Sequence, residues 1–276
     1  MKMKYIPCAE RTRQLDSAGL REAFLIDDLF VKGEIKLYYV DCERAVVGTA
    51  CPAGAPLKLE AADALRAAYF CERREMTALN IGGPGAVVVD GVRYALENME
   101  LLYIGRGSKE VSFESGDAAN GAEFYLVSYP AHASYPTTKS AKGDANSFRA
   151  GTPEQANMRT LNQQVCEARI KSCQLVTGYT QLDPGSVWNT MPSHTHERRS
   201  EVYMYFGIEP DQAVFHYMGA PDETRHIVVR NKNVVISPSW SIHSGCGTKN
   251  YTFVWAMGGE NQRFDDMDPA PTETLR

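Results

Sequence analysis

Three histidines and one glutamate in the C-terminal half of the chain have the residue types and spacing of a metal site. His194 and His196 are separated by one residue, Glu201 follows after four more, and His243 comes after a turn-rich stretch. Because a β-strand points alternate side chains to the same face, His194 and His196 can face a common ion. Three imidazole nitrogens and one carboxylate suit zinc, iron, manganese or nickel, and donor softness alone does not choose among them.

A second carboxylate, Glu197, competes with Glu201 because it directly follows His196. On a continuing strand the Glu197 side chain would face away from both histidines, whereas Glu201 opens the next expected strand. We therefore expect Glu201 to complete the site. With four protein ligands, a substrate oxygen must add to the coordination shell or displace a ligand, so catalysis needs an expandable coordination number. The isolated His132 and His216 are expected to be ordinary polar residues.

Other residues near these ligands are candidates to bind or transform a substrate. The candidate general bases are Tyr203, Tyr205, His226 and Glu197. The candidate substrate contacts are Arg225, Lys249, Arg199, Trp188 and Trp240. Guanidinium groups match carboxylates through paired hydrogen bonds, so the cations would suit an acidic substrate. For each residue taken singly, core packing or a solvated surface charge is the alternative interpretation.

Short apolar strings separated by turn residues make up most of the chain. Strings rich in Val, Ile, Tyr and Phe recur at roughly 8–12-residue spacing, which is typical of a sandwich or barrel. The clearest lie at 86–90, 202–206, 213–218, 226–229, 234–236 and 251–255. Helical signals are few, at 16–24, 61–68 and 152–163. The sequence predicts a mainly all-β protein with a few short helices.

The chain also contains an internal echo. Residues 46–54 (VVGTACPAG) resemble 176–185 (VTGYTQLDPG), and 72–75 (ERRE) resemble 197–201 (ERRSE). Two similar β units would explain both matches, although similar turn chemistry recurs by chance in any β protein. A polar stretch lies between the halves. We expect an N-terminal unit at 1–130, a linker at 131–160 and a C-terminal metal-binding unit at 161–276.

Composition and charge exclude several classes of protein. The 276 residues carry a formal net charge of −5, which leaves no basic field for nucleic acid or an anionic membrane. Residues 1–13 have charges throughout and no apolar core of a signal peptide, and no apolar run approaches the roughly 18 residues of a membrane helix. Seven cysteines, none in a C-x-x-C pattern, are expected to be reduced thiols. We expect a cytoplasmic protein.

Several strings resemble those of a known family. Residues 188–199 (WNTMPSHTHERR), 223–228, 236–245 and 259–268 are similar to the 5-keto-4-deoxyuronate isomerases (4-deoxy-L-threo-5-hexosulose-uronate ketol-isomerases) of pectin catabolism. In the N-terminal half, 72–75 and 80–83 also match. The resemblance extends over about residues 18–268.

This resemblance implies a bicupin, that is, two cupin-type antiparallel β-barrels. The second barrel would bind one Zn²⁺ per chain through His194, His196, Glu201 and His243. The first has no histidine near 72–75 and carries Gly-Arg-Gly at 105–107 where the second has Pro-Ser-Trp at 238–240. It is therefore expected to have lost its metal and to serve as scaffold or oligomer contact. The family is hexameric, which implies a homo-oligomer.

The implied reaction converts 5-dehydro-4-deoxy-D-glucuronate to 3-deoxy-D-glycero-2,5-hexodiulosonate, an aldose–ketose exchange between C1 and C2. Zinc can polarise the carbonyl and the neighbouring hydroxyl during such a reaction. A proton-transfer route needs a base near C2, which neither the residues nor the resemblance identifies. The alternatives on the same scaffold are an iron-dependent cupin dioxygenase and a non-catalytic metal-binding bicupin.

Overall fold

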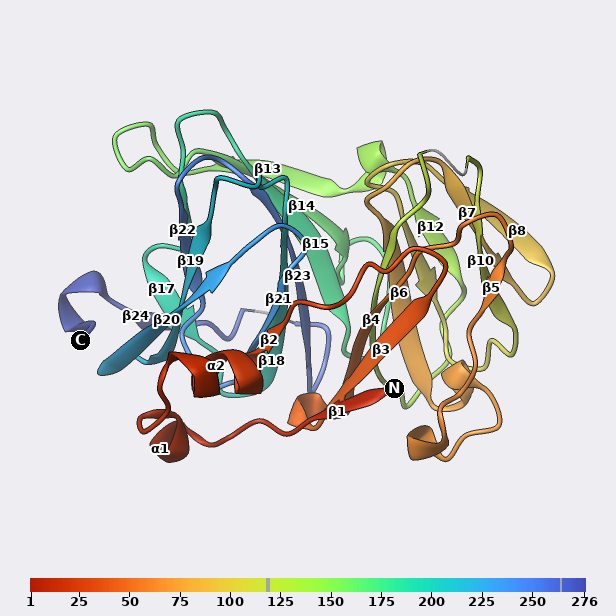
Figure 1. The fold of residues 1–276 in the computed structure, drawn as a ribbon, viewed down its shortest axis with the longest axis horizontal. Helices are drawn as coiled ribbons and strands as arrows, with labels where there is room; N and C mark the ends of the chain where they lie inside the picture. The colour runs from red at the N-terminus through yellow and green to blue at the C-terminus, as the bar shows by residue number, and fades with distance from the viewer. Residues whose placement is uncertain (118–119, 264) are drawn as a thin grey trace. The chain divides into compact units, whose positions relative to one another are not determined.

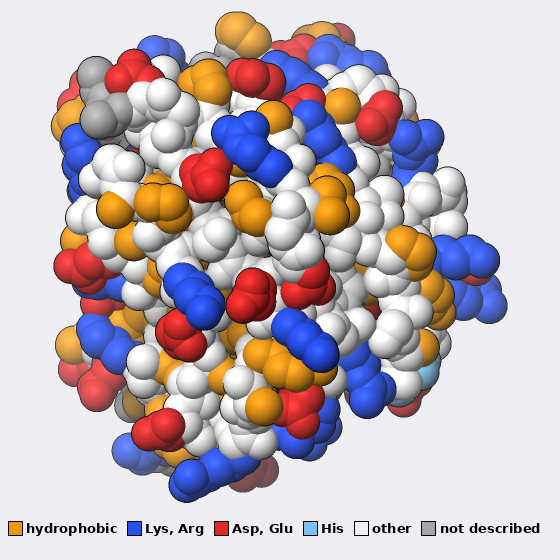
Figure 2. Space-filling view, turned by 90° about the vertical axis from the view of Figure 1, so that its right-hand side faces the viewer, with side chains coloured by type: hydrophobic (Ala, Val, Ile, Leu, Met, Phe, Trp, Pro, Cys, Tyr) orange, Lys and Arg blue, Asp and Glu red, His pale blue; other side chains and the backbone are white. Residues whose placement is uncertain are grey.

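The computed structural model describes residues 1–117, 120–263 and 265–276, and most of its regular structure is β-strand (Figure 1). The described α-helices are α1 (Ala9–Thr12) and α2 (Ser17–Phe24). The mainly all-β prediction is confirmed. Neither described helix has the length and apolar character needed to cross a membrane. On the face in Figure 2, basic and acidic side chains are interspersed rather than gathered by sign.

The chain forms two compact units. The N-terminal unit comprises Met1–Lys4, Asp28–Ala145 and Gln164–Val176, and the C-terminal unit comprises Tyr5–Asp27, Asn146–Gln163 and Thr177–Arg276. Residues 5–27 therefore join the C-terminal unit, whereas the sequence suggested a unit at 1–130. The reason is packing: Phe24 of α2 is fully buried, and its ring meets Trp240 edge-on with centroids 6.3 Å apart.

The N-terminal unit contains two sheets in its described residues. The seven-stranded sheet has the order β1 (Lys2–Lys4), β3 (Ile35–Val40), β4 (Ala45–Ala50), β11 (Phe124–Pro130), β6 (Arg74–Asn80), β9 (Leu101–Ile104) and β12 (Thr138–Ser140). The four-stranded sheet has the order β5 (Leu57–Lys58), β10 (Val111–Ser115), β7 (Gly85–Val89) and β8 (Val92–Leu96). Side chains such as Met76, Phe113 and Phe124 join one hydrophobic cluster.

The C-terminal unit repeats this plan in its described residues. Its seven-stranded sheet has the order β13 (Asn146–Ala150), β14 (Arg159–Val165), β15 (Val176–Leu182), β23 (Thr252–Gly259), β18 (Arg199–Phe206), β21 (Val234–Ser237) and β2 (Leu25–Ile26). The four-stranded sheet has the order β16 (Trp188–Asn189), β22 (Ser244–Gly247), β19 (Val214–Ala220) and β20 (Glu223–Val229). A short pair, β17 (Ser193–Thr195) and β24 (Asp268–Ala270), completes the unit.

The two sheet orders match the internal echo. The echoed strings at 46–54 and 176–185 begin within β4 and at β15, each third in its sheet, and β6 and β18 are each fifth. Both fifth strands begin with an arginine. Met76 is the third residue of β6 and Glu201 is the third residue of β18, so these two positions are equivalent. Glu75 falls on the other face of β6, where Tyr103 and the Cys173 amide donate hydrogen bonds to it at 2.7 Å.

Of the three expected helices, one formed as predicted. Helix α2 begins after Asp16, whose Oδ1 accepts a 2.8 Å hydrogen bond from the Gly19 amide. The 61–68 segment contains only a 3₁₀ turn, Asp63–Leu65. The 152–163 helix was wrong. The Thr152 hydroxyl does accept from the Gln155 amide at 3.3 Å, but the chain then turns and enters β14, which pairs with β13. The expected linker therefore contains strands.

Candidate metal centre

Three strands of the C-terminal unit, with the loops beside them, bring the candidate ligands together. His194 lies in β17, His196 follows that strand, Glu201 lies in β18, and His243 directly precedes β22. The His196 amide donates to the carbonyl of Ser239 at 3.2 Å, which fixes the loop after β17 against the loop before β22. Pairing of β18 with β21 sets Glu201 opposite Ser237, so the strand register places its carboxylate beside that same loop.

The donor atoms converge at short range. One ligand atom from each of the four residues lies within 4.8 Å of the others. His194 Nε2 is 2.9 Å from His243 Nε2, and His196 Nε2 is 3.0 Å from Glu201 Oε1. His243 Nε2 is 3.5 Å from the same carboxylate oxygen. The histidines that the sequence grouped by spacing therefore share one small volume with Glu201, whereas Glu197 is exposed.

Burial sets the protonation of this cluster. It lowers the pKa of His194 to about 3, with the neighbouring His243 acting in the same direction. Burial also lowers the pKa of His243 to about 4. For Glu201, burial opposes ionisation, but the histidines, led by His243 and His196, hold the pKa of its carboxyl at about 2. Near neutral pH His194 and His243 are therefore neutral imidazoles and Glu201 is a carboxylate, the forms that bind a metal.

A divalent cation fits these residues. Glu201 is only 4% exposed, and no Lys or Arg in the described chain forms an ion pair with it. A buried carboxylate without a cation is strongly destabilising, and the neutral imidazoles of His194 and His243 do not supply the missing positive charge. Among the described residues, this is also the group of His, Cys, Asp and Glu found close enough together to hold an ion. The cluster could therefore bind a metal.

A second layer of polar groups surrounds the cluster. Ser237 Oγ lies 3.4 Å from His243 Nδ1, and Asp266 Oδ1 lies 3.8 Å from His196 Nδ1. Asp266 is itself held by Arg199, which is fully buried and donates from Nε at 3.1 Å. Ligating histidines commonly depend on such outer carboxylates for ring orientation. Arg199 therefore holds Asp266 in position beside His196.

A cavity of ≈ 350 Å³ opens over the cluster and includes His194, His196 and Glu201 in its wall. Its apolar lining includes Phe148, Leu161, Phe253, Trp255, Met257 and Met267. Its polar lining includes Arg159, Gln163, Thr180, Thr190 and Tyr203. This size suits a small molecule.

Tyr203 is the one candidate base that lines this cavity in the described chain. Burial and the adjacent negative charge of Glu201 raise its pKa well above the usual value, so its hydroxyl stays protonated. Tyr205 is buried outside the cavity wall, and its hydroxyl lies 2.7 Å from His216 Nδ1. His226 and Glu197 are exposed. Tyr203 can therefore donate a hydrogen bond to a ligand, whereas the other three do not face the cavity.

The candidate substrate contacts lie elsewhere. Arg225 pairs with Glu223 at 2.8 Å, and Trp188 stacks on Tyr217 with centroids 5.8 Å apart. Trp240 packs against α2, Arg199 pairs with Asp266, and Lys249 is absent from the described cavity lining. Their proposed role stays a prediction that no cavity contact supports.

Sequence reasoning missed Arg159. This residue begins β14 and lines the cavity. The sequence predicts a linker and a helix for this segment, where an isolated arginine does not indicate a binding site. Only the sheet order, which places β14 in the same sheet as β23 and β18, reveals its position.

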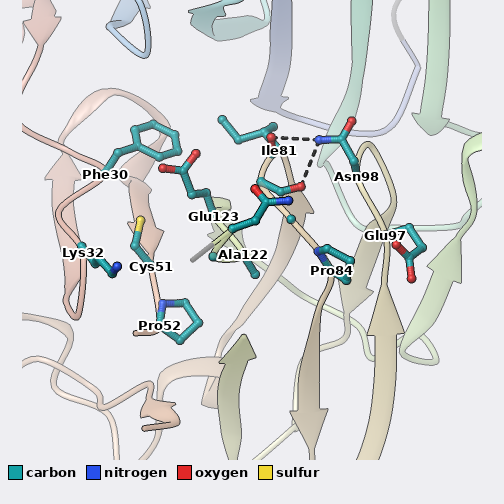
Figure 3. Close-up of a pocket in the computed structure, with 14 residues that line it drawn as sticks. Phe30, Lys32, Cys51, Pro52, Ile81, Pro84, Glu97, Asn98, Ala122 and Glu123 are labelled. Carbon is teal, nitrogen blue, oxygen red and sulfur yellow. Dashed lines mark hydrogen bonds between the residues drawn. The ribbon is translucent and has the colours of Figure 1, made fainter. Parts of the chain in front are cut away.

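The N-terminal unit has a larger cavity, of ≈ 630 Å³, but with different chemistry (Figure 3). No histidine belongs to its described lining. The Asn98 amide group, drawn in Figure 3, already donates to the carbonyls of Ile81 and Gly82 at 2.9 and 3.1 Å. Cavity size alone therefore does not identify the reactive site; the donor set does.

The chain is similar to known proteins over most of its length. The family model described as the KduI/IolB family matches residues 28–272. A 4-deoxy-L-threo-5-hexosulose-uronate ketol-isomerase of Lachnoclostridium phytofermentans is 55% identical over 276 residues, covering 100% of both chains. The enzyme of that name from Formosa agariphila is 51% identical over 273 residues, covering 99% of this chain and 98% of the relative.

Solved structures show a similar fold at low identity. An IolB-like protein of Salmonella typhimurium LT2 has a TM-score of 0.72 at 15% identity, covering 87% of this chain and 94% of its own. The oxalate decarboxylase of Bacillus subtilis, whose structure was studied for its Mn(II) centres, has a TM-score of 0.57 at 11% identity, covering 81% of this chain and 71% of its own. At such identities the likeness concerns the fold alone.

Proposed function

The chain belongs to the KduI/IolB family, and on that premise we propose that it is a zinc-dependent ketol-isomerase acting on 5-dehydro-4-deoxy-D-glucuronate. The resemblance found in the sequence to the 5-keto-4-deoxyuronate isomerases is confirmed by the relatives. The observation that carries the proposal is the cluster of three histidines and Glu201, of which His194, His196 and Glu201 line a cavity of small-molecule size. The product would be 3-deoxy-D-glycero-2,5-hexodiulosonate, an intermediate of pectin and uronate breakdown.

The exchange needs no external oxidant or reductant. A hydrogen leaves C2 and one is gained at C1, while a proton is lost from the C2 hydroxyl and one is gained by the C1 oxygen. The C1 aldehyde becomes a hydroxymethyl group, and the C2 alcohol becomes a ketone. A site for this reaction must therefore bind both oxygens and handle negative charge on them.

The residues of the chain divide these tasks. A metal ion held by His194, His196, Glu201 and His243 would supply Lewis acidity at the substrate oxygens. Tyr203, which stays protonated beside Glu201, holds a proton within the cavity and can donate it to a substrate oxygen. The apolar side chains Phe253 and Trp255 exclude water around the carbon chain.

The decisive experiment combines metal analysis with an isomerase assay. We expect purified protein to contain about one zinc per chain and to convert the deoxyuronate. Removal of the metal with a chelator should abolish turnover, and zinc should restore it. Oxygen uptake with iron and no isomerisation would favour the dioxygenase alternative. Metal loss that unfolds the C-terminal unit, in a protein without turnover, would favour a structural site.

We further propose a homo-oligomer in the cytoplasm. Support comes from the hexameric state that the family resemblance implies and from the seven cysteines, which are thiols rather than disulfides in the structure. Light scattering on the purified protein should give a mass of six chains; a monomer would contradict the proposal.

A further inference from the structure

Arg159 differs from the other cavity residues in charge. It is the one Lys or Arg among the described residues that line the cavity. It enters from β14, which the sheet order separates from the Glu201 strand, β18, by β15 and β23. The guanidinium and the metal cluster therefore belong to different parts of the cavity wall.

The guanidinium of Arg159 lacks an acidic partner. The half-buried side chain donates one hydrogen bond, from Nη1 to the Asn157 carbonyl at 2.8 Å, and no Asp or Glu of the described chain pairs with it. Burial lowers the pKa of Arg159, although the neighbouring phenols of Tyr203 and Tyr251 oppose that shift. A guanidinium has five N–H donors, so enough remain to bind a carboxylate through two of them.

Other arginines of the same unit have the acidic partner that Arg159 lacks in the described chain. Arg199 pairs with Asp266, Arg225 with Glu223, and Arg149 with Asp183. Each of these cations is neutralised by the protein. Arg159 is partly desolvated without such compensation, which is unfavourable unless an anion arrives from solution.

We infer that Arg159 binds the substrate carboxylate and so selects hexuronates over neutral sugars. This inference rests on the proposed isomerase function. An open-chain hexuronate has its carboxylate at one end and the C1 carbonyl at the other, so anchoring one end on Arg159 presents the other to the metal cluster. The methylene at C4 of a 4-deoxyuronate would face side chains such as Phe253 and Met257, which offer no hydrogen bond to a missing hydroxyl. Arg159 is thus a specificity residue.

Kinetics on substituted proteins test the role of Arg159. We expect Arg159→Met to lower kcat/KM for the deoxyuronate about 100-fold, mainly through KM, because a desolvated charge pair loses one partner. Arg159→Lys keeps the charge without the paired geometry and should lose about 10-fold. The matched control is Arg230→Met, since Arg230 likewise donates to one carbonyl, that of Gln212, but lies outside the described cavity lining. Zinc content should be unchanged in all three. Unchanged KM in Arg159→Met would overturn the inference.

A binding measurement separates this inference from the proposed function. L-Gulonate, a hexuronate reduced at C1, cannot isomerise, and glucitol is the same chain without the carboxylate. By calorimetry on zinc-loaded wild-type protein, we expect L-gulonate to bind at least about 30-fold more tightly than glucitol. Arg159→Met should remove that preference while leaving glucitol unaffected. Equal affinity of the wild-type protein for both ligands would overturn the inference, even if Arg159→Met does not fold. A wild-type protein that prefers L-gulonate but isomerises no uronate would refute the proposed function alone.

Discussion

Two strands in the same place in their sheets, β6 and β18, carry opposite chemistry. Met76 in β6 belongs to a continuous hydrophobic cluster, whereas Glu201 in β18 meets three histidines. Two residues further along each strand, Ala78 lies in the same apolar cluster and Tyr203 lines a cavity. One plan of strands therefore supports either an apolar core or a candidate active site, and a few inward-facing positions decide which.

The two units also differ in the side chains that are buried in their cores. The N-terminal cluster consists of apolar side chains whose burial is favourable by itself. The C-terminal core instead contains His216, which is fully buried with its pKa lowered to about 3 by burial. Its Nε2 has no hydrogen-bond partner in the described chain. Polar groups held this way reduce stability, and the N-terminal unit has one as well, the Tyr125 hydroxyl, which has no hydrogen-bond partner in the described chain.

The largest expected effect comes from removing one ligand. His243→Ala should lower turnover by about 10³-fold or more and strip the metal, because the remaining donors bind an ion poorly. The fold should survive, since both units have cores that do not depend on a metal staple. Metal analysis, kinetics and circular dichroism on the same sample test this. Full turnover by a zinc-free His243→Ala protein would refute the catalytic assignment.

The reverse experiment places a carboxylate in the N-terminal core. Met76→Glu should reduce the free energy of unfolding by about 3–5 kcal/mol, because the new carboxylate would be buried in a cluster of apolar side chains. Met76→Leu keeps the volume and should cost less than about 1.5 kcal/mol. Urea titrations measure both values. If Met76→Glu bound a second zinc ion, the two units would be closer in chemistry than the structure indicates.

Tyr203→Phe tests the hydroxyl group of Tyr203, whose equivalent position in the N-terminal unit is the apolar Ala78. We expect kcat to fall about 100-fold with metal content unchanged, since a positioned proton donor is lost while the ring still stacks on Phe253. Tyr217→Phe is the control, because Tyr217 stacks on Trp188 and is not part of the described cavity lining. Equal kcat in both variants would remove Tyr203 from the mechanism.

A smaller effect should follow from changing Asp266, which lies beside the candidate metal ligand His196. Asp266→Asn leaves the shape of the side chain but removes the charge near His196 and beside Arg199. Zinc affinity should fall about 10–100-fold, as is usual when an outer carboxylate is lost. The exposed Asp265, which pairs with Arg263, gives the control Asp265→Asn. Competition with a chromogenic chelator measures the affinities, and equal values would contradict this supporting role.

The sequence grouped His194, His196 and Glu201 as candidate ligands because they lie within eight residues of one another. Alternation along a strand aligns His194 with His196, and the same parity disfavours Glu197, which the structure leaves exposed. It did not identify Arg159, because the position of that residue depends on pairing between strands distant in sequence. The predicted helix at 152–163 failed for the same reason: pairing of β14 with β13 overrode the local capping signal.

The docking of α2 shows the same limit at the level of the units. A helix over 16–24 follows from local capping and composition, but its partner does not. Its buried Phe24 contacts Trp240, so the helix belongs to the C-terminal unit although the chain then returns to build the N-terminal one. Such contacts depend on tertiary packing, which short-range patterns do not encode.

The last expected effect concerns the rate at which thiols react in the two units. Cys71 is fully buried in the N-terminal cluster, and burial raises its pKa to about 12. Cys246 in β22 of the C-terminal unit is half-buried. At pH 8 the native protein should react with iodoacetamide at Cys246 at least about 100-fold faster than at Cys71, because Cys71 must wait for its core to open. Peptide mass spectrometry over time gives both rates, with exposed Cys8 as the fast reference and urea-unfolded protein as the common end point. Comparable rates would mean that the apolar unit opens as readily as the unit that carries the metal cluster, and the contrast between a closed core and an accessible site would not hold.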